Sequence, residues 1–266
     1  MLQQSTNKRR SSAVSQAFRS VTTRLENNHS PIANPLKEIV VRHAESRADL
    51  KQVFSLAYEV YFEKGYAFNH ATKWETSAYD SHKDTLILMV ENGNKEIIGS
   101  MTLYYDDGKF LPADHIFKTE ICSLRQQGIK CAEVSRFVVR KDHQHKKEIL
   151  LGLINYVYIH AFRIMGIDEF IIEVNPRHVD FYRKLLGYVQ LGEIKECPRV
   201  NNAPAVLLRG TKDKYLNVVE NSIYEKRTLY NSFISKSAES EVIRTLTSKR
   251  PMTMADQIYF GIRNPF

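Results

Sequence analysis

Apolar and polar positions follow regular periods through most of the chain between residues 38 and 210. Short runs rich in β-branched and aromatic residues predict strands, and apolar positions three or four residues apart predict helices. The predicted strands cover 38–43, 85–91, 96–105, 133–139, 168–175, 188–194 and 203–210. The predicted helices cover 47–65, 147–166 and 177–187, and Gly65 and Gly187 are suited to end the first and the last of them.

The order of these elements predicts the fold class. Strand–helix–strand units imply parallel strand pairs, whereas the NGNK sequence at 92–95 predicts an antiparallel hairpin. We therefore expect an α/β fold, a mixed sheet with helices on both of its faces. The folded domain would occupy 37–211, between a basic tail at 1–36 and a helical extension at 212–266.

Composition narrows the class of protein. With 43% hydrophobic and 26% charged residues among 266, the chain has the balance of a globular protein with a substantial core. Its formal net charge of +8 favours an acidic partner, such as a phosphate-bearing cofactor, an acidic protein, nucleic acid or an anionic membrane surface. Three cysteines without CxxC spacing favour reduced thiols, so we expect a cytoplasmic protein.

The first 36 residues are basic, rich in serine and poor in acids. They contain no continuous apolar stretch, so they do not resemble a secretory signal, and no apolar run elsewhere is long enough to span a bilayer. Their composition favours a disordered tail. The alternative is a short amphipathic basic helix around Phe18 and Leu25 that makes a peripheral membrane contact.

The strand predicted at 133–139 carries unexpected charges. Its sequence is EVSRFVV, in which Glu133 and Arg136 lie among apolar residues. Charges in a buried strand must be paired or used in chemistry. A run of cations follows the strand at Arg140, Lys141, His143, His145, Lys146 and Lys147. This run is either a solvated loop or a site for an anionic partner, and two histidines among cations offer too few ligands for a metal, so no metal site is expected.

Several motifs together resemble a known family. NPRHVDFYRKLLGY at 175–188 is similar to the segment of GNAT-superfamily acyltransferases that packs beside the pantetheine arm of the acyl donor. EVSRFVV resembles the E-x-S-R-F motif of acyl-homoserine lactone synthases, and WETSAYD at 74–80 resembles their acidic E-x-D-x-Y-D segment. With AYEVYFEKGY at 57–66, the combination is most similar to the long-chain N-acyl amino acid synthases. The resemblance implies a GNAT-like, mostly antiparallel sheet with a splayed strand pair, and transfer of a fatty acyl group to the amine of an amino acid.

The resemblance also implies catalytic roles. An unpaired backbone N–H at Val138 or Val139 would bind the oxyanion that develops on the thioester carbonyl. Glu133 would take a proton from the amine, although a structural ion pair with Arg136 or a neighbour accounts for it equally well. Tyr182 would protonate the leaving thiolate, or it is a half-buried core tyrosine.

Other residues are expected to hold the substrates. Arg136 would bind the carboxylate of an amino acid through its planar fork. Further substrate contacts are expected from Ser135, Glu75, Asp80, Asn175 and His178. The structural alternatives are a loop that caps the next strand for Glu75 and Asp80, and helix capping for Asn175.

The basic loop bears on the acyl donor. CoA-dependent GNAT enzymes carry a glycine-rich pyrophosphate loop, whereas the loop here, RKDHQHKKEI, has no glycine. The cations Arg140, Lys141, His145, Lys146 and Lys147 instead suit the acidic surface and single phosphate of an acyl carrier protein. We therefore expect acyl-phosphopantetheine on acyl carrier protein, or acyl-CoA, as the co-substrate, and no permanently bound cofactor.

Two departures from the family pattern leave rival functions open. Ser77 and Thr102 stand where acyl-homoserine lactone synthases have an acidic and a basic residue for S-adenosylmethionine, which weakens the lactone synthase alternative. A short-chain N-acetyltransferase is the other enzyme alternative. The alternative of another class is a non-catalytic basic module that binds membrane or nucleic acid, and nucleic acid is the less favoured partner.

Overall fold

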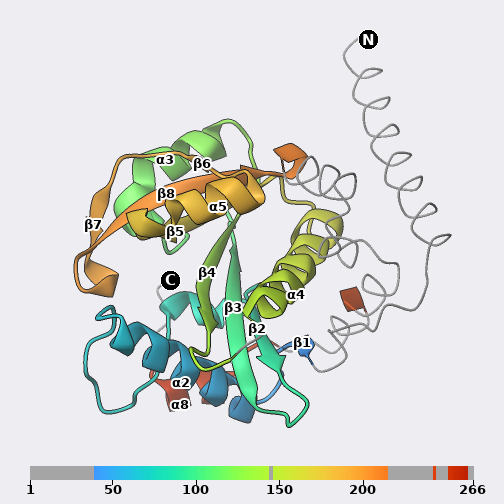
Figure 1. Ribbon diagram of the computed structural model, residues 1–266. Helices are drawn as coiled ribbons and strands as arrows, with labels where there is room; N and C mark the ends of the chain where they lie inside the picture. The colour runs from blue at the N-terminus through green and yellow to red at the C-terminus, as the bar shows by residue number, and fades with distance from the viewer. Residues whose placement is uncertain (1–38, 144–145, 215–241, 244–250, 263–266) are drawn as a thin grey trace, which may run out of the picture.

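The computed structural model describes residues 39–143, 146–214, 242–243 and 251–262 (Figure 1). Its centre is an eight-stranded sheet in the order β1-β2-β3-β4-β5-β8-β6, with β7 paired to β8. The strands are β1 (Val40–His43), β2 (Leu86–Glu91), β3 (Ile97–Tyr105), β4 (Cys131–Val139), β5 (Glu169–Val174), β6 (Val189–Gln190), β7 (Lys195–Cys197) and β8 (Ala203–Thr211). Each neighbouring pair is antiparallel except β4 and β5, so the predicted mixed, mostly antiparallel sheet is confirmed.

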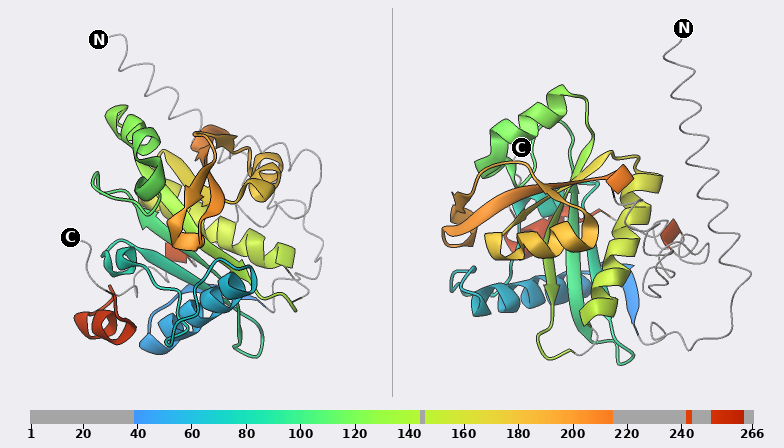
Figure 2. Two further views of the ribbon diagram at one scale, coloured as in Figure 1. Left: turned by 90° about the vertical axis from the view of Figure 1, so that its left-hand side faces the viewer. Right: turned by 45° about the horizontal axis from the view of Figure 1, so that its top comes forward.

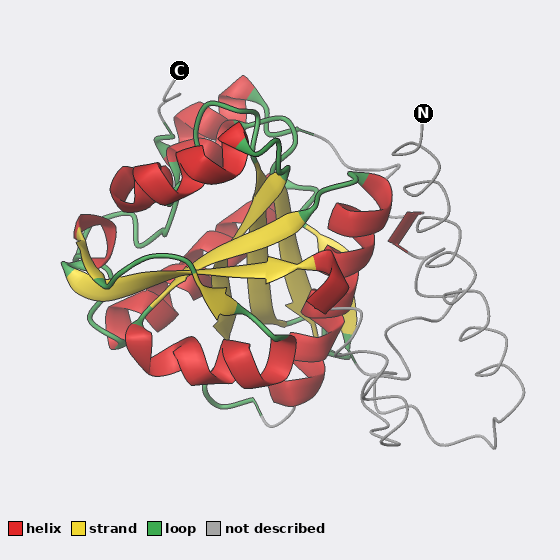
Figure 3. Ribbon diagram, turned by 90° about the horizontal axis from the view of Figure 1, so that it is seen from above, coloured by secondary structure: helices red, strands yellow, loops and turns green. Residues whose placement is uncertain are grey.

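Helices cover both faces of the sheet, as the view from above shows (Figure 3). The helical elements are α2 (Arg47–Glu63), η2 (Ala78–Ser81), α3 (Asp114–Gln126), α4 (Lys146–Tyr158), the π-helix η3 (Ile159–Ile164), η4 (Pro176–His178), α5 (Val179–Leu186), η5 (Pro198–Val200) and α8 (Met254–Phe260). Side chains of α2 and α3 pack on one face of the sheet, and those of α4 and α5 pack on the other. No helix in the described part of the chain is long and apolar enough to cross a bilayer.

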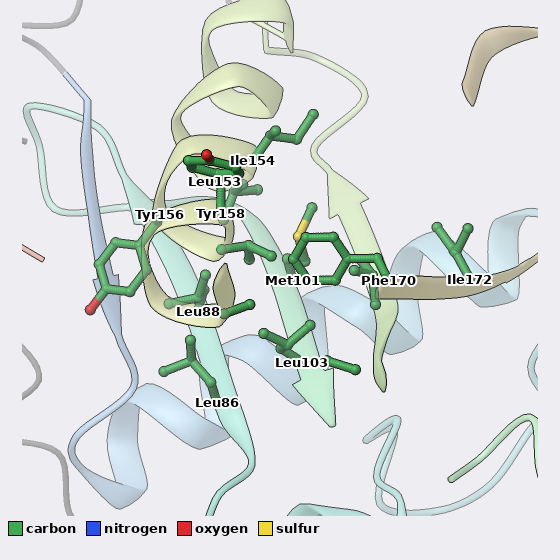
Figure 4. Close-up of a cluster of buried hydrophobic side chains, with 14 of the residues drawn as sticks. Leu86, Leu88, Met101, Leu103, Leu153, Ile154, Tyr156, Tyr158, Phe170 and Ile172 are labelled. Carbon is green, nitrogen blue, oxygen red and sulfur yellow. The ribbon is translucent and has the colours of Figure 1, made fainter. Parts of the chain in front are cut away.

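The larger core lies on the α4 face of the sheet (Figure 4). Leu86 and Leu88 of β2 pair with Leu103 and Met101 of β3, and all four residues lie against α4. Leu153 of α4 is fully buried among them. Because burying a side chain of this size stabilises a fold by about 1.5–3 kcal/mol, this face anchors β3 and β4 firmly.

Part of the C-terminal extension packs against α2. The ring of Phe260 in α8 meets the ring of Phe54 in α2 edge-on, with centroids 5.0 Å apart, and it lies 5.1 Å from the ring of Trp74. Arg47 at the start of α2 donates to Asp256 of α8 over 2.7 Å. The helix α8 therefore contributes to the core on the α2 face. The predicted N-terminal tail and the helical pattern at 215–234 lie outside the described residues.

Strands β4 and β5 separate part-way along their length. Residues 131–134 of β4 pair with 169–172 of β5, and beyond them the described register of this pair ends. At the same level Arg136 has φ of 46°, and the register of β4 on β3 shifts between Ser100 and Thr102. An extra residue in one strand bends that strand and increases its twist. The bulge therefore bends β4 at the level where its pairing with β5 ends. In the right-hand view of Figure 2, β8 runs at a steep angle to β3 and β4.

Two elements of the fold were not predicted from the sequence, and two others differ from their predictions. The helix α3 was not predicted, although Phe117, Ile121 and Leu124 have helical spacing and are buried. The strand β7 was also missed, β6 is only two residues long, and the helix predicted at 147–166 ends as a π-helix. Short edge strands give little periodicity, and a π-helix is set by packing rather than by local pattern.

Candidate active site

A cavity of about 1330 Å³ passes through the opening between β4 and β5. Its walls include Tyr104 and Glu133 from the α2 face of the sheet. They also include Phe137, Ile172 and Tyr182 from the α4 face. Because residues of both faces line one cavity, a long substrate can cross the plane of the sheet at this opening.

Glu133 lies at the base of the opening and is 1% exposed. Its Oε2 accepts a hydrogen bond from the backbone N–H of Ala113, at 2.8 Å, at the start of α3. Burial raises the pKa of the Glu133 carboxyl to about 8, against the lowering effect of Arg199 and with a further raising effect of Glu173. A carboxyl that titrates near neutral pH can exchange a proton with an amine, as a general base must.

Arg136 is committed to the protein. Its two terminal nitrogens bind both carboxylate oxygens of Asp80, the Nη1–Oδ2 pair being 2.8 Å apart. It also donates to the carbonyl of Glu75 and to Oγ1 of Thr102, and it is 5% exposed. The partner of Arg136 is therefore Asp80 and not Glu133. Since its fork already holds a carboxylate, the role of Arg136 as the grip for a substrate carboxylate stays a prediction that this geometry does not favour.

Asp80 is buried and acts as a hub. Besides Arg136, it accepts hydrogen bonds from the Tyr104 hydroxyl, at 2.8 Å, and from the backbone N–H of Ser77, at 2.7 Å. The Ser77 bond belongs to the capping box at the start of η2. Asp80 is not among the residues that line the cavity. The alternative considered from the sequence was a loop that caps the next strand, whereas Asp80 caps the helix η2.

Glu75 does line the cavity, and burial raises the pKa of its carboxyl while Arg136 opposes that rise. In the part of the chain that the structure describes, no hydrogen bond to its carboxylate is found. Glu75 is thus a partly buried acid that faces the space where a substrate would bind. Ser135 lies in the wall between Glu133 and Arg136.

The direction of the Val139 N–H follows from the pairing of β4 with β3. The N–H of Arg140 donates to the carbonyl of Ile98 in β3 over 2.9 Å. Successive N–H groups of a strand point to opposite sides. The N–H of Val138 is therefore directed to β3, and that of Val139 is directed to the side from which β5 has separated. Of the two oxyanion donors considered from the sequence, the geometry favours Val139.

Residues of the α5 segment line the opposite wall. Tyr182 is half-buried beside Phe181 and Tyr188, and burial raises the pKa of its hydroxyl to about 12. Asn175 lines the cavity while its Oδ1 caps η4 through the N–H of Arg177, at 3.2 Å. His178 also lines the cavity, and burial together with Arg177 and Lys64 lowers the pKa of its ring.

Among the described side chains of the basic loop, that of Lys141 lines the cavity. Arg140 pairs with Asp142 over 3.3 Å and does not line the cavity, whereas the exposed Lys141 does. His145 lies outside the described residues, and Lys146 and Lys147 open α4 with side chains that are not described. Lys64, which the sequence did not single out, also lines the cavity, and Arg177 acts on it electrostatically. Among the described residues, no group of three or more potential metal ligands comes together.

Arg199 was also missed by the sequence analysis. It lies in η5, lines the cavity, and donates from Nη2 to Oε2 of Glu173 over 2.5 Å. A short segment between β7 and β8 has no periodicity that marks a functional residue. Only the sheet register shows that β8 brings this segment beside β5.

Comparison with known proteins identifies the family. A family model described as N-acyl amino acid synthase FeeM matches residues 52–211, which is more than half of the chain. The chain belongs to the FeeM family of N-acyl amino acid synthases. It is therefore an N-acyltransferase that transfers an acyl group to the amine of an amino acid. The expectation drawn from the motifs at 57–66, 133–139 and 175–188 is confirmed at this level.

Solved structures agree with the GNAT-like fold of a FeeM-family enzyme. FeeM from uncultured soil microbes has a TM-score of 0.59 and 24% identity, over 66% of this chain and 93% of FeeM. The CoA-dependent acyl-homoserine lactone synthase BjaI, with S-adenosylmethionine and isopentyl-CoA, has a TM-score of 0.52 and 16% identity, over 77% and 98%. TofI, in complex with an inhibitor and MTA, has a TM-score of 0.51 and 17% identity, over 65% and 91%. A sequence comparison with curated proteins found no match.

Proposed function

We propose that this FeeM-family enzyme transfers a long-chain fatty acyl group from the phosphopantetheine thioester of an acyl carrier protein to the amine of an α-amino acid. The observation that carries the proposal is the cavity through the opening between β4 and β5, with Glu133 and the Val139 N–H on its walls. A thioester in this opening would present its carbonyl oxygen to Val139. The amino acid would approach from the side of Glu133.

The reaction requires the removal of one proton before the attack. Ionised Glu133 takes a proton from the ammonium group of the amino acid, and the neutral amine attacks the thioester carbon. The developing oxyanion is held by the N–H of Val139. The C–N bond forms, and as the C–S bond breaks the departing thiolate takes the second proton of the nitrogen and leaves as the thiol. Tyr182, which stays protonated because its pKa is about 12, donates a hydrogen bond to that thiolate.

An apolar space beyond the opening supports a long acyl chain. A second cavity, of about 30 Å³, lies between α4, α5 and the sheet. It shares Val134, Phe137, Leu150, Ile172 and Tyr182 with the larger cavity. Its remaining walls are apolar or aromatic. An acyl tail that passes between β4 and β5 would bury its methylene groups against these shared walls of the larger cavity, at about 0.8 kcal/mol each. The second cavity extends that space by about one methylene group.

Cations on the cavity wall support a carrier protein as the donor. Lys64 and Lys141 line the cavity, and the exposed Arg177 donates from Nε to Nε2 of His178, a further wall residue, over 3.2 Å. Point charges of this kind suit an acidic protein surface and a single phosphodiester. The glycine-free loop at 140–149 offers no backbone cradle for the pyrophosphate of CoA. BjaI shows that an enzyme of this fold can depend on CoA, so the donor must be tested directly.

The experiment offers the purified full chain two donors with the same long acyl chain, carrier-protein thioester and CoA thioester. Each donor is combined with a panel of amino acids, and products are identified by mass spectrometry. We expect N-acyl amino acids, with kcat/KM at least tenfold higher for the carrier protein. A preference for CoA would overturn the donor assignment. An absence of amide product from every pair, with folded protein, would overturn the proposed function.

A further inference from the structure

An α-amino acid carries its carboxylate two bonds from its amine. A base that contacts the amine and a cation that contacts the carboxylate must therefore be neighbours in the site. Glu133 is the proposed base, and Arg136 is the nearest arginine along the chain. The Arg136 fork is already filled by Asp80, as both terminal nitrogens bind that carboxylate. Another cation must be sought on the walls of the same cavity.

Sheet register places Arg199 close to Glu133. Glu133 of β4 pairs with Ile171 of β5, and Glu173 follows two residues later, so all three side chains lie on one face of the sheet. Arg199 is tied to that face by its 2.5 Å bond to Glu173. Arg199 and Glu133 both line the large cavity, and each acts electrostatically on the other.

The guanidinium of Arg199 has donors to spare. An arginine offers five N–H donors in a planar fork. Within the described residues, Glu173 is the acceptor found for Arg199, through Nη2. The Arg199 side chain is 37% exposed, against 4% for Arg136, so a ligand can reach it. An arginine held by one acid and open along another edge is suited to bind a second carboxylate with two parallel hydrogen bonds.

We propose that Arg199 binds the α-carboxylate of the acceptor and makes the enzyme selective for amino acids over simple amines. This inference rests on the proposed function and adds the residue that selects the acceptor. The acceptor would lie between β4 and η5, with its carboxylate at Arg199 and its amine at Glu133. The competing explanation is that Arg199 only ties η5 to β5 through Glu173.

The test compares an amino acid with its α-amide, which keeps the amine and the side chain but lacks the carboxylate. For Arg199→Gln we expect KM for the amino acid to rise about 10- to 100-fold, as for the loss of charge-assisted hydrogen bonds. The KM for the amide is expected to change less than about threefold. Arg199→Lys keeps the charge without the fork and is expected to give an intermediate result. Arg183→Gln, which removes an exposed arginine of α5 that pairs with Asp180, is the matched control and leaves the ratio unchanged.

Calorimetric binding of reaction products tests the role of Arg199 independently of catalytic activity. The wild-type enzyme is expected to bind an N-acyl amino acid more tightly than the matching N-acyl amino amide, and Arg199→Gln is expected to abolish that difference. A preserved difference in the variant, or equal losses for acid and amide, would overturn the role of Arg199. Failure of the wild-type enzyme to acylate either acceptor would count against the proposed function alone, because binding still decides the inference. Thermal unfolding of each variant verifies that it is folded.

Discussion

Replacing Glu133 by glutamine is expected to make the protein more stable and the enzyme far slower. The carboxyl is 1% exposed, and burial raises its pKa from 4.5 to about 8. The folded protein therefore binds this proton more tightly than the unfolded chain does. The stability contributed by the protonated carboxyl is fully present below pH 4.5 and is lost as the pH rises toward 8. Glutamine has no proton to lose, so it escapes this cost.

The magnitude follows from the separation of the two pKa values. Each pH unit between them costs about 1.4 kcal/mol. Ionisation of Glu133 then costs the folded wild-type protein about 2 kcal/mol at pH 6 and about 4 kcal/mol at pH 8. Any constant offset from the new amide group is the same at every pH. The difference in unfolding free energy between Glu133→Gln and wild type is thus expected to widen by about 3 kcal/mol from pH 5 to pH 8.

Urea unfolding of both proteins at pH 5, 6, 7 and 8 measures this difference. Activity is measured on the same samples. For the wild type we expect kcat/KM to rise with pH until about pH 8, because only ionised Glu133 can accept the proton. For Glu133→Gln we expect kcat to fall about 10²- to 10⁴-fold, the usual contribution of a general base. The exposed Glu193, changed to glutamine, is the control.

A stability difference that stays flat between pH 5 and pH 8 would refute the reasoning, because Glu133 would then be ionised without cost in the folded protein. If the stability difference widens with pH but kcat is unchanged, the raised pKa of Glu133 is supported and its role as the base is not.

Three further predictions test the rest of the site. Asp80→Asn removes one partner of a buried ion pair and should lower the free energy of unfolding, measured in urea, by about 3–5 kcal/mol. The control Asp142→Asn, in the exposed pair with Arg140, should leave this free energy unchanged. Equal effects of the two variants would contradict the stabilising role of the buried Asp80–Arg136 pair. Tyr182→Phe should lower kcat about tenfold, as for one lost hydrogen bond, and leave KM for the acceptor unchanged. An unaltered kcat would mean that Tyr182 is a core residue without a role in the reaction. The double variant Lys64→Glu, Lys141→Glu should raise KM for acyl carrier protein about tenfold but leave KM for a free acyl-pantetheine unchanged. An equal rise of KM with both donors would argue against docking of the carrier protein at these cations.

Local patterns sufficed to predict the central strands and most of the helices. The strands at 85–91 and 96–105 and the helix at 47–65 lie within two residues of β2, β3 and α2, because each has a strong period and a clear end. The splayed strand pair was expected from the family resemblance, which also placed Glu133 beside the amine of the acceptor. The hydrogen bond that Glu133 accepts could not be predicted from the sequence. Its donor, the N–H of Ala113, stands at the start of α3, a helix that was not predicted.

Long-range partners account for the other differences. Arg136 and Asp80 are 56 residues apart, and a single sequence does not indicate that they pair. The motif therefore suggested that Arg136 binds substrate. Arg136 does line the cavity, but its terminal nitrogens pair with Asp80 in the segment before β2. Arg199 could not be singled out from the sequence either. It becomes part of the cavity wall because β8, which follows it, pairs with β5.

The backbone of Arg136 has an energetic consequence for substrate entry. A non-glycine residue in the left-handed region costs about 1–3 kcal/mol, and here it is held by Asp80, Glu75 and Thr102. The strain is met once, during folding. On the proposed function, the acyl donor would enter a slot that already exists and would break no hydrogen bonds between neighbouring strands. No binding free energy is then needed to separate β4 from β5, so all of it can stabilise the bound thioester.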